Sequence, residues 1–378
     1  MRNILLFGFF IFLFMACSAG QDEFVRMLSD LKDSQKTQRE SKIEKYIRAQ
    51  REIPVKKDSV VYFVFKNNSE KTVYLSGDMT SWKPDSLPMK HIVGTMYWYI
   101  RQVYPTDSRL EYKFVLDKKY LLDPLNPLRD RGGYGYNSVL TMPDYHFPQE
   151  ILLRKKSGVT PLDSIQFESK FLHNQREILF YHHPSAGPNA PLILFNDGQD
   201  YLQLAGANII LDNLIGQNQI PALKAVFINP VKRMHEYGLD DAYLKMVFKE
   251  LLPFLKKEKH ISGREPLFMG GASLGGLTAL YSLKDYQRSL SGIFAQSASI
   301  WVEQEKVLDV LKATSFKKGL RIYSDYGTFE NQQVVQTRLQ KILQKKNVLF
   351  EIKPFHEGHN WGNWRAHLSG ALTFLLTR

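Results

Sequence analysis

One short segment constrains the fold of this chain more than any other. From Pro266 to Leu280 the sequence reads PLFMGGASLGGLTAL, an apolar run, then Gly-Ala-Ser-Leu-Gly, then a helix-forming run. That order predicts a strand, a sharp turn and a helix, because glycines on both sides of Ser273 let strand and helix approach without Cβ clashes. A Ser on such a strained turn presents its hydroxyl at the top of a sheet. Ser273 is therefore the candidate nucleophile.

The chain is long enough to bury two cores. Its 378 residues are 44% hydrophobic and 13% aromatic, and a chain of this length exceeds the usual size of one domain. We expect two folded domains, preceded by a signal and a spacer. The expected parts are residues 1–20 as a signal peptide, 21–54 as a charged helical spacer, 55–148 as an all-β sandwich and 149–378 as an α/β domain.

The N-terminus has the layout of an export signal. Arg2 precedes a run of Leu, Phe and Ile that is too short to span a bilayer comfortably. Cys17 follows in FMACSAG, where a lipoprotein signal places its lipidated residue, although Phe14 stands where a smaller aliphatic residue is usual. Cleavage near Ala19 by an ordinary signal peptidase is the alternative. We expect an exported protein, periplasmic or associated with the outer membrane, that reaches the membrane through a lipid on Cys17.

Composition argues against several classes of function. Cys17 is the only cysteine, so no disulfide and no cysteine-based catalytic or metal site is expected. The net charge of +12 comes from basic residues spread along the chain, without a nucleic-acid-binding motif. The simplest interpretation of this charge is a generally basic, solvated surface. The other is that the charge attracts an anionic membrane or an acidic substrate. We expect no nucleic-acid partner.

The segment between Asp22 and Ile53 is charged and has a helical pattern. Its apolar residues recur at spacings of three and four among Lys, Arg, Glu, Gln and Ser, which predicts amphipathic helix. Two interpretations stay open at this point. The segment is either a spacer that lifts the body from the membrane or a helix packed on a domain.

Residues 59–145 alternate between short apolar stretches and turns. The stretches VVYFVF, TVYLSG, YWYIRQVY, EYKFVLD and NSVLTM are separated by turn residues, which predicts an antiparallel sandwich of about seven strands. Trp82, Trp98 and Tyr97 are candidates for stacking on a sugar. Large aromatic residues at strand positions belong more often to a core, so the sugar site is the weaker interpretation.

Strand patterns alternate with helical patterns through the rest of the chain. This alternation implies a mostly parallel sheet with helices on both faces. The predicted fold class is therefore α/β, an α/β-hydrolase sheet preceded by an all-β sandwich. We expect a hairpin at 165–181, strands at 191–195, 225–229, 267–269, 292–295, 320–323 and 348–354, and the clearest helices at 242–259 and 331–345.

A serine nucleophile needs a base and an acid, because its hydroxyl reacts poorly at neutral pH. An imidazole takes the proton, and a buried carboxylate orients the imidazole and stabilises its charged form. In an α/β-hydrolase sheet the acid and then the base follow the serine along the chain, each after a later strand. His356 and His359 both follow the strand expected at 348–354. His359 is the better base, because Gly358 permits a tight loop and the last helix begins directly after it.

Two carboxylates compete for the role of the acid. Asp325 and Glu330 both follow the strand expected at 320–323. Glu330 is the first choice and Asp325 the alternative. Either could instead be structural, with Asp325 capping a turn and Glu330 the next helix, where a carboxylate in the first turn is stabilised in any case.

An oxyanion hole requires two backbone N–H groups aimed at the developing negative charge. One would belong to Leu274, directly after the candidate nucleophile. The other should come from the loop after the strand at 191–195, which reads Asn-Asp-Gly-Gln-Asp. There Gly198 would permit the turn that points the N–H of Gln199 inward. Asp-Gly is also a common turn, so this loop is weak evidence by itself.

Several motifs taken together resemble a known family. FNDGQD, RMHEY, ELLPFLKK, GASLGGLTALY, QSAS and GHNWGNWR follow one another in this order. From residue 191 onward the chain resembles the esterase family that includes enterochelin esterases, feruloyl esterases and S-formylglutathione hydrolase, and above all the enterochelin esterase branch. That branch carries an N-terminal early-set immunoglobulin-like module, which residues 75–82, 112–117 and 137–139 also resemble. The resemblance therefore covers both expected domains.

The resemblance implies roles for individual residues. Beside the triad, it implies side chains that line or brace the pocket, Arg233 among them. An ion pair between Arg233 and Glu236 would explain that arginine equally well. The implied roles are nucleophile for Ser273, base for His359, acid for Glu330, and substrate contact or pocket support for Arg233, Trp301 and Trp361.

The chain departs from the enterochelin esterase branch at three positions. Asn360 stands where Asp is usual, Val302 where a second aromatic residue follows Trp301, and Ala298 where Gly is usual. These departures bear on the identity of the substrate more than on the chemistry.

The sequence thus predicts an exported serine carboxylic-ester hydrolase that acts through an acyl-enzyme on Ser273 and needs no metal or cofactor. The expected substrate is a catecholate siderophore lactone first and a feruloyl or acetyl ester on polysaccharide second. A non-catalytic, glycan-binding surface lipoprotein is one alternative, and the presence of every triad candidate argues against it. An acyltransferase on the same scaffold is the other.

Overall fold

The computed structural model describes residues 22–151, 158–259 and 261–377. The predicted signal segment 1–20 and its Cys17 lie outside the described residues, so export and lipidation stay predictions. Within these three ranges, none of the helices combines the length and the apolar character needed to cross a bilayer.

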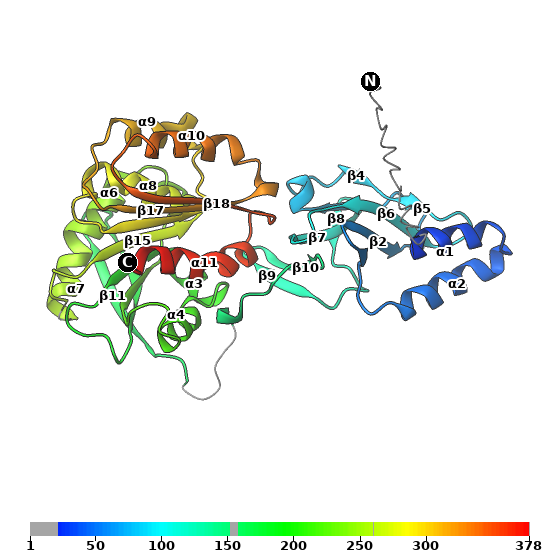
Figure 1. Ribbon diagram of the computed structural model, residues 1–378, viewed down its shortest axis with the longest axis horizontal. Helices are drawn as coiled ribbons and strands as arrows, with labels where there is room; N and C mark the ends of the chain where they lie inside the picture. The colour runs from blue at the N-terminus through cyan, green and yellow to red at the C-terminus, as the bar shows by residue number, and fades with distance from the viewer. Residues whose placement is uncertain (1–21, 152–157, 260, 378) are drawn as a thin grey trace, which may run out of the picture.

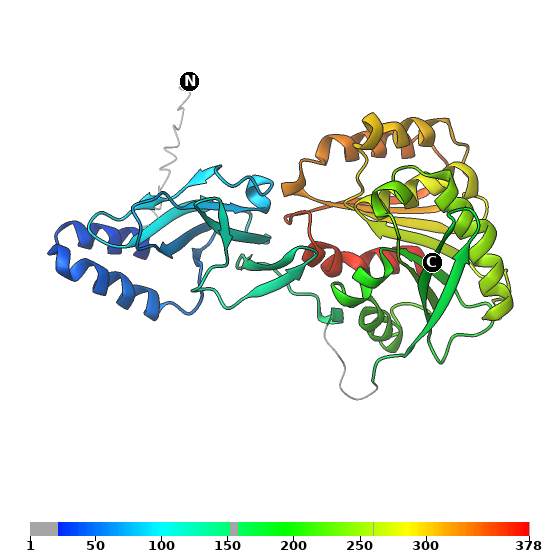
Figure 2. The same ribbon diagram turned by 180° about the vertical axis from the view of Figure 1, so that it is seen from behind.

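The chain folds into two lobes that lie end to end, an all-β lobe and an α/β lobe (Figure 1). The β lobe is built from antiparallel sheets, and the larger lobe from a mostly parallel sheet between helices. This arrangement confirms the predicted fold class. The view from behind shows that the α/β lobe meets only one end of the β lobe (Figure 2).

Two antiparallel sheets form the β lobe. One has the strand order β1-β2-β6-β5, and the other has the order β4-β3-β7-β10-β9 with β8 beside β7. More strands are present than the seven predicted, because several have only two or three residues and are too short for a sequence pattern. The strands are β1 (Val55–Lys57), β2 (Val60–Lys66), β3 (Tyr74–Gly77), β4 (Leu87–Pro88), β5 (Lys90–His91), β6 (Tyr97–Val103), β7 (Arg109–Leu116), β8 (Lys119–Leu121), β9 (Arg129–Gly132) and β10 (Gly135–Thr141).

Aromatic residues of the β lobe serve mainly as core. Tyr97 and Trp98 are both buried, so neither ring offers a face to a sugar. Phe63 packs edge-on against Tyr112, with ring centroids 4.8 Å apart, and both belong to the cluster between the sheets. Trp82 is half-buried, and its indole N–H donates to a carboxylate of the lobe itself. The structure therefore favours the core interpretation of these residues.

Two helices, α1 (Glu23–Lys32) and α2 (Lys36–Ala49), precede the first strand. They lie on the four-stranded sheet at the end of the β lobe farthest from the α/β lobe (Figure 2). Phe24 stacks on Tyr62 with ring centroids 4.2 Å apart, and Ile43 is buried in the same cluster. The helices are thus packed on a domain, which is the second of the two interpretations that the sequence left open.

The α/β lobe contains one eight-stranded sheet with the order β11-β12-β14-β13-β15-β16-β17-β18. The first two strands form an antiparallel hairpin, and the six from β13 to β18 are parallel to one another. The carboxyl ends of the parallel strands therefore meet at one edge, which is where open α/β sheets place their ligand sites. The strands are β11 (Leu162–Ser169), β12 (Asn174–His182), β13 (Leu192–Asn196), β14 (Lys224–Ile228), β15 (Leu267–Ala272), β16 (Gly292–Gln296), β17 (Arg321–Gly327) and β18 (Leu349–Phe355).

Helices cover both faces of this sheet (Figure 1). One hydrophobic cluster joins the sheet to α6 through α10, and another joins it to α3, α4 and α11. The sequence predicted one helix at 242–259, but a π-helical segment η3 divides it, with Pro253 just beyond, where its missing N–H interrupts α-helical bonding. The helices are α3 (Gly198–Gln203), α4 (Ala207–Gly216), α5 (Arg233–Glu236), α6 (Asp241–Lys245), η3 (Met246–Leu251), α7 (Leu252–Glu258), α8 (Leu274–Tyr286), α9 (Lys306–Ala313), α10 (Gln333–Leu343) and α11 (Trp361–Leu376).

Gly270→Ala is expected to destabilise the sheet. A Cβ at Gly270 would lie 2.0 Å from ring carbons of Phe294 on the neighbouring strand β16, and overpacking of this kind costs about 1–3 kcal/mol of unfolding free energy. Phe294→Leu in the same chain should recover part of the loss, because the shorter side chain vacates that space. Urea unfolding of the two single variants and the double variant measures the coupling.

The control is Gly216→Ala on α4, where a Cβ would meet no atom within 4 Å. Alanine there should be neutral or slightly stabilising. Strict additivity of the Gly270 and Phe294 substitutions would contradict the packing argument.

Candidate active site

Ser273 occupies the turn between β15 and α8, with φ at 57° and ψ at −120°. A non-glycine residue in this region costs about 1–3 kcal/mol, so the surrounding structure must hold it there. The neighbouring glycines make the turn possible, since a Cβ at Gly271 would lie 2.7 Å from the carbonyl carbon of Gly275. The sequence pattern thus forms the predicted strand, strained turn and helix.

His359 lies in hydrogen-bond contact with both of its expected partners. Its Nε2 is 3.0 Å from the Oγ of Ser273, and its Nδ1 is 2.9 Å from the Oε2 of Glu330. Glu330 follows β17 and His359 follows β18, so the carboxyl ends of adjacent parallel strands bring them together. The histidine side chain is 41% exposed, whereas that of Glu330 is 1% exposed. The candidate base is thus open to solvent, and the candidate acid is shielded from it.

The buried carboxylate of Glu330 is surrounded by donors, which is the condition under which a charge can stay in a protein interior. One donor is itself fixed in place, because the Nε1 of Trp364 donates to the Oγ of Ser297 at 2.9 Å. Besides His359, the donors to Glu330 are Ser297 Oγ at 2.6 Å, the Gly327 N–H at 2.8 Å, Gln332 Nε2 at 2.9 Å and Asn363 Nδ2 at 3.3 Å.

Asp325, the alternative acid, has a different place. Its side chain is fully buried beneath the site, where Oδ2 accepts from the Nε2 of Gln296 at 3.1 Å. Burial raises the pKa of the Asp325 carboxyl well above its usual range, and the hydrogen bond from Gln296 only partly opposes this. The structure therefore brings Glu330, and not Asp325, to the imidazole.

The two expected oxyanion donors differ in the bonding of their N–H groups. Leu274 is the first residue of α8, so its N–H has no acceptor within the helix. The N–H of Gln199 donates to the Oδ1 of Asn229, 2.6 Å away. An oxyanion would have to share this donor or displace the Asn229 amide.

Gly198 has a different role from the one expected. The left-handed residue of the loop is Asp197, with φ at 53°. A Cβ at Gly198 would lie 2.4 Å from the backbone of Phe227 on β14. The glycine is required because the loop passes close to the next strand, and the turn itself is made by the preceding residue.

Arg233 forms a two-pronged ion pair with Asp197, with both N–O distances at 2.7 Å. The expected alternative, a pair between Arg233 and Glu236, is wrong, because Glu236 binds Arg176 at 2.8 Å instead. Burial raises the pKa of Asp197 above its usual value, and the Arg233 guanidinium opposes this only in part. Arg233 thus braces the loop that carries Gln199.

The two tryptophans that the resemblance implicated lie in different surroundings. Trp301 is 63% exposed, so its ring is available to a ligand. Trp361 is 7% exposed and packs edge-on against Tyr201 and Trp364, with centroid distances of 5.2 and 4.8 Å. Its position fits support of the site rather than direct contact with a ligand.

Sequence reasoning missed Ser299 and Asn229 as neighbours of the site. The Oγ of Ser299 is 3.1 Å from that of Ser273, and its N–H donates to the Ser273 carbonyl at 3.0 Å. The QSAS segment that contains Ser299 was visible as a motif after a strand. Only the tertiary structure shows that its last serine faces the elbow.

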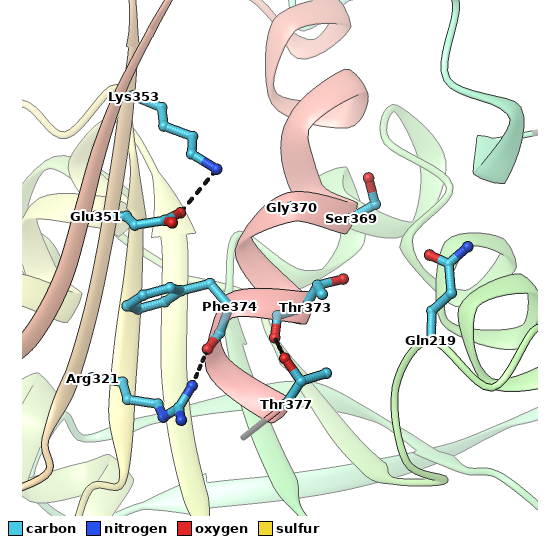
Figure 3. Close-up of a pocket in the computed structure, with 9 residues that line it drawn as sticks. All are labelled: Gln219, Arg321, Glu351, Lys353, Ser369, Gly370, Thr373, Phe374 and Thr377. Atoms are coloured by element: carbon cyan, nitrogen blue, oxygen red, sulfur yellow. Dashed lines mark hydrogen bonds and ion pairs between the residues drawn. The ribbon is translucent and has the colours of Figure 1, made fainter.

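Two further observations concern possible ligands. In the described part of the chain, no three His, Cys, Asp or Glu side chains are grouped as metal ligands would be; a mechanism without a cofactor stays a prediction. A hollow of about 450 Å³ lies beside the C-terminal half of α11, away from the triad (Figure 3). Its cations are engaged, since Arg321 donates to the carbonyl of Phe374, and Lys353 binds Glu351 at 2.9 Å.

Comparison with known proteins places this geometry in a family. The family model described as "Putative esterase" matches residues 169–375, more than half of the chain. The chain belongs to this esterase family. It is 27% identical over 280 residues to the iron(III) enterobactin esterase of Escherichia coli O6:H1, and the alignment covers 68% of this chain and 66% of that protein. The chain thus spans slightly less than two thirds of that curated relative.

Solved structures share the fold of this chain over both lobes. The enterobactin esterase FES from Shigella flexneri, crystallised in the presence of enterobactin, superposes with a TM-score of 0.70 at 23% identity, covering 84% of this chain and 92% of that one. The ferric enterobactin esterase from Salmonella typhimurium gives a TM-score of 0.72 at 21% identity, covering 88% and 98%. The β lobe is therefore part of the shared architecture.

Asp325→Asn is expected to stabilise the fold increasingly as pH rises. Because burial raises the pKa of Asp325 in the folded state, the unfolded chain releases this proton at a lower pH than the native protein does. The native state then binds more protons, and the wild-type protein loses stability with rising pH through that window. The amide has no proton to release, so the stability difference should grow from pH 5 to pH 8 in urea unfolding.

The matched control is Asp309→Asn on the exposed face of α9. It should show a difference that changes little over the same range. A stability gain for Asp325→Asn that shrinks toward pH 8 would contradict a raised pKa at Asp325.

Proposed function

We propose that this chain is a serine carboxylic-ester hydrolase with Ser273 as nucleophile, His359 as base and Glu330 as acid. The observation that carries the proposal is the continuous hydrogen-bond path from Ser273 through both ring nitrogens of His359 to Glu330, at 3.0 and 2.9 Å. The strained turn at Ser273 supports it, because that backbone geometry costs free energy and serves to present the hydroxyl. Membership of an esterase family supports ester hydrolysis as the reaction.

The proposed reaction begins when His359 takes the proton of Ser273 as its Oγ attacks the ester carbonyl. The N–H groups of Leu274 and Gln199 stabilise the oxyanion, for which the second must exchange its contact with Asn229. The imidazolium, stabilised by Glu330, then protonates the leaving alcohol. Water activated by the same imidazole hydrolyses the acyl-enzyme on Ser273 and restores the serine.

For the substrate we propose an aromatic siderophore lactone first, and a feruloyl or acetyl ester second. The relatives named as enterobactin esterases support this order, and the exposed ring of Trp301 is suited to stacking on an aromatic acyl group. The net charge of +12 favours an anionic substrate over a neutral one. Export and a lipid on Cys17 belong to the same proposal and rest on the sequence of residues 1–20.

Ser273→Ala and His359→Ala are each expected to lower kcat on p-nitrophenyl acetate about 1,000-fold or more, because the hydroxyl and its base act as one unit. Glu330→Gln should lower kcat about 100-fold or more, since the imidazolium loses its counter-charge. Labelling by a fluorophosphonate should require Ser273. The control is Ser289→Ala at an exposed position after α8, which should keep full activity and labelling.

Activity that survives Ser273→Ala in a folded protein would overturn the serine mechanism. No turnover and no labelling in the parent protein would overturn the enzyme proposal itself.

The kcat/KM for a tricatecholate trilactone is expected to exceed that for methyl ferulate by at least about tenfold. The reason is that its aromatic, acidic arms can form polar and stacking contacts with the site that the smaller ester lacks. Initial rates are measured on methyl ferulate and on the trilactone, and the trilactone is tested both without and with bound iron. Equal rates, or a preference for the ferulate, would overturn the siderophore proposal and leave the esterase proposal standing. Partitioning of the acyl group toward an added alcohol would indicate acyl transfer instead of hydrolysis.

A further inference from the structure

The β lobe touches the α/β lobe at the two loops that carry the acid and the base. On the acid side, the ring of Phe329 packs edge-on against Tyr104 of the β lobe, with centroids 5.9 Å apart. Phe329 also packs against the core of the β lobe. Two residues after Phe329, the Nδ2 of Asn331 is 3.4 Å from the Oγ of Ser81. Glu330 thus lies between two residues that are held by the β lobe.

On the base side, Asn360 is the residue through which the lobes meet. Its Nδ2 donates to the Oδ2 of Asp78 at 2.9 Å, and its Oδ1 accepts from the Nη1 of Arg109 at 3.3 Å. The same Oδ1 caps α11 by accepting from the N–H of Asn363 at 3.0 Å. One buried side chain, next to His359 in sequence, therefore both begins the last helix and binds the β lobe.

The loop is shaped to receive these β-lobe side chains. A Cβ at Gly358 would lie 2.1 Å from the Cγ of Asp78, and a Cβ at Gly362 would lie 2.1 Å from the Nη1 of Arg109. The backbone N–H of Arg109 also donates to the carbonyl of His356 at 3.1 Å. The β lobe is therefore in contact with the loop on both sides of His359.

The hydrogen bonds that join Asn360 to Asp78 and Arg109 form a clamp between the lobes, and their chemistry favours an amide at position 360. Asp78 can only accept when ionised, and it already accepts from the N–H of Glu111 at 2.7 Å and from the Nε1 of Trp82 at 3.2 Å. Burial, together with the neighbouring Glu111, already raises the pKa of Asp78 to about 7. A carboxylate at 360 would place a second acidic group against it in a buried place, so the pair could stay there only by sharing a proton. The Asn that departs from the enterochelin esterase branch is thus explained by its partner on the β lobe.

We propose that Asp78 and Arg109 are positioning residues, which act through Asn360 to hold His359 in line with Ser273 and Glu330. The proposal rests on the proposed serine mechanism and assigns the β lobe a part in it. The lobe then contributes to kcat through the geometry of the base. A displacement of about 1 Å in a catalytic group costs about 100-fold in rate, so modest loosening of this clamp is measurable.

Asn360→Ser separates docking from helix capping. Serine keeps an oxygen that caps α11 well, but it loses the amide that binds Asp78. We expect kcat on p-nitrophenyl acetate to fall at least about fivefold with KM little changed, because the base is misplaced and the binding surface is not. Rates are expressed per active site, titrated with a fluorophosphonate, so that a poorly folded fraction does not count.

Asn360→Asp tests the charge argument and should lower kcat further, by at least about tenfold. Asp78→Asn in the same chain restores a donor opposite a carboxylate and should recover part of that loss. The control is Asn218→Asp, the same substitution at an exposed turn after α4, which should leave kcat unchanged.

A kcat per titrated site within about twofold of the parent for both Asn360 variants would overturn the positioning role. A loss in Asn360→Asp with no recovery in the double variant would also overturn it. Failure of Ser273→Ala to abolish activity would instead overturn the serine mechanism, so the two failures are distinguishable.

Discussion

A serine at φ 57° and ψ −120° costs free energy that its surroundings must supply. At Ser273 the surroundings do so from both sides of the chain. Its N–H donates to the carbonyl of Gln296 on the neighbouring strand, and its carbonyl accepts from Ser299 and Leu277. The glycines beside it permit the close approach of strand and helix. Because the turn is held in this way, the hydroxyl has one direction in which to meet a base.

The other half of the site depends on where a charge can be buried. Asp325 lies within β17 and Glu330 just after that strand, and both side chains are shielded from water. Glu330 is surrounded by donors, whereas the Asp325 side chain accepts from Gln296 at 3.1 Å and has a pKa raised by burial. Of the two, Glu330 contacts the imidazole, at 2.9 Å, and is therefore placed to stabilise an imidazolium. The difference between the two lies in their partners and not in their residue type or distance along the chain.

The contact between the lobes joins the α/β domain to a β module that the sequence pattern predicts as a separate domain. Arg109 is buried with acidic neighbours Glu111 and Asp130 on the β lobe, and it reaches Asn360 in the loop that carries His359. Such buried charged groups stay in place only when every partner is present. The interface therefore has a defined register, and this register bears directly on the histidine loop. A polysaccharide-binding role for the β lobe receives no support from its buried Tyr97 and Trp98.

The sequence by itself determined the order of strands and helices, the elbow at Ser273 and the candidates that follow it, because apolar periodicity and glycine spacing are local properties. It ranked Glu330 ahead of Asp325 but left Asp325 open, since the environments of both carboxylates come from distant segments. It assigned the turn to Gly198, where only the neighbouring strand shows that lack of space, and not backbone conformation, requires glycine. The tertiary structure alone decided the place of Asn360, because its partners Arg109 and Asp78 lie 251 and 282 residues earlier in the chain.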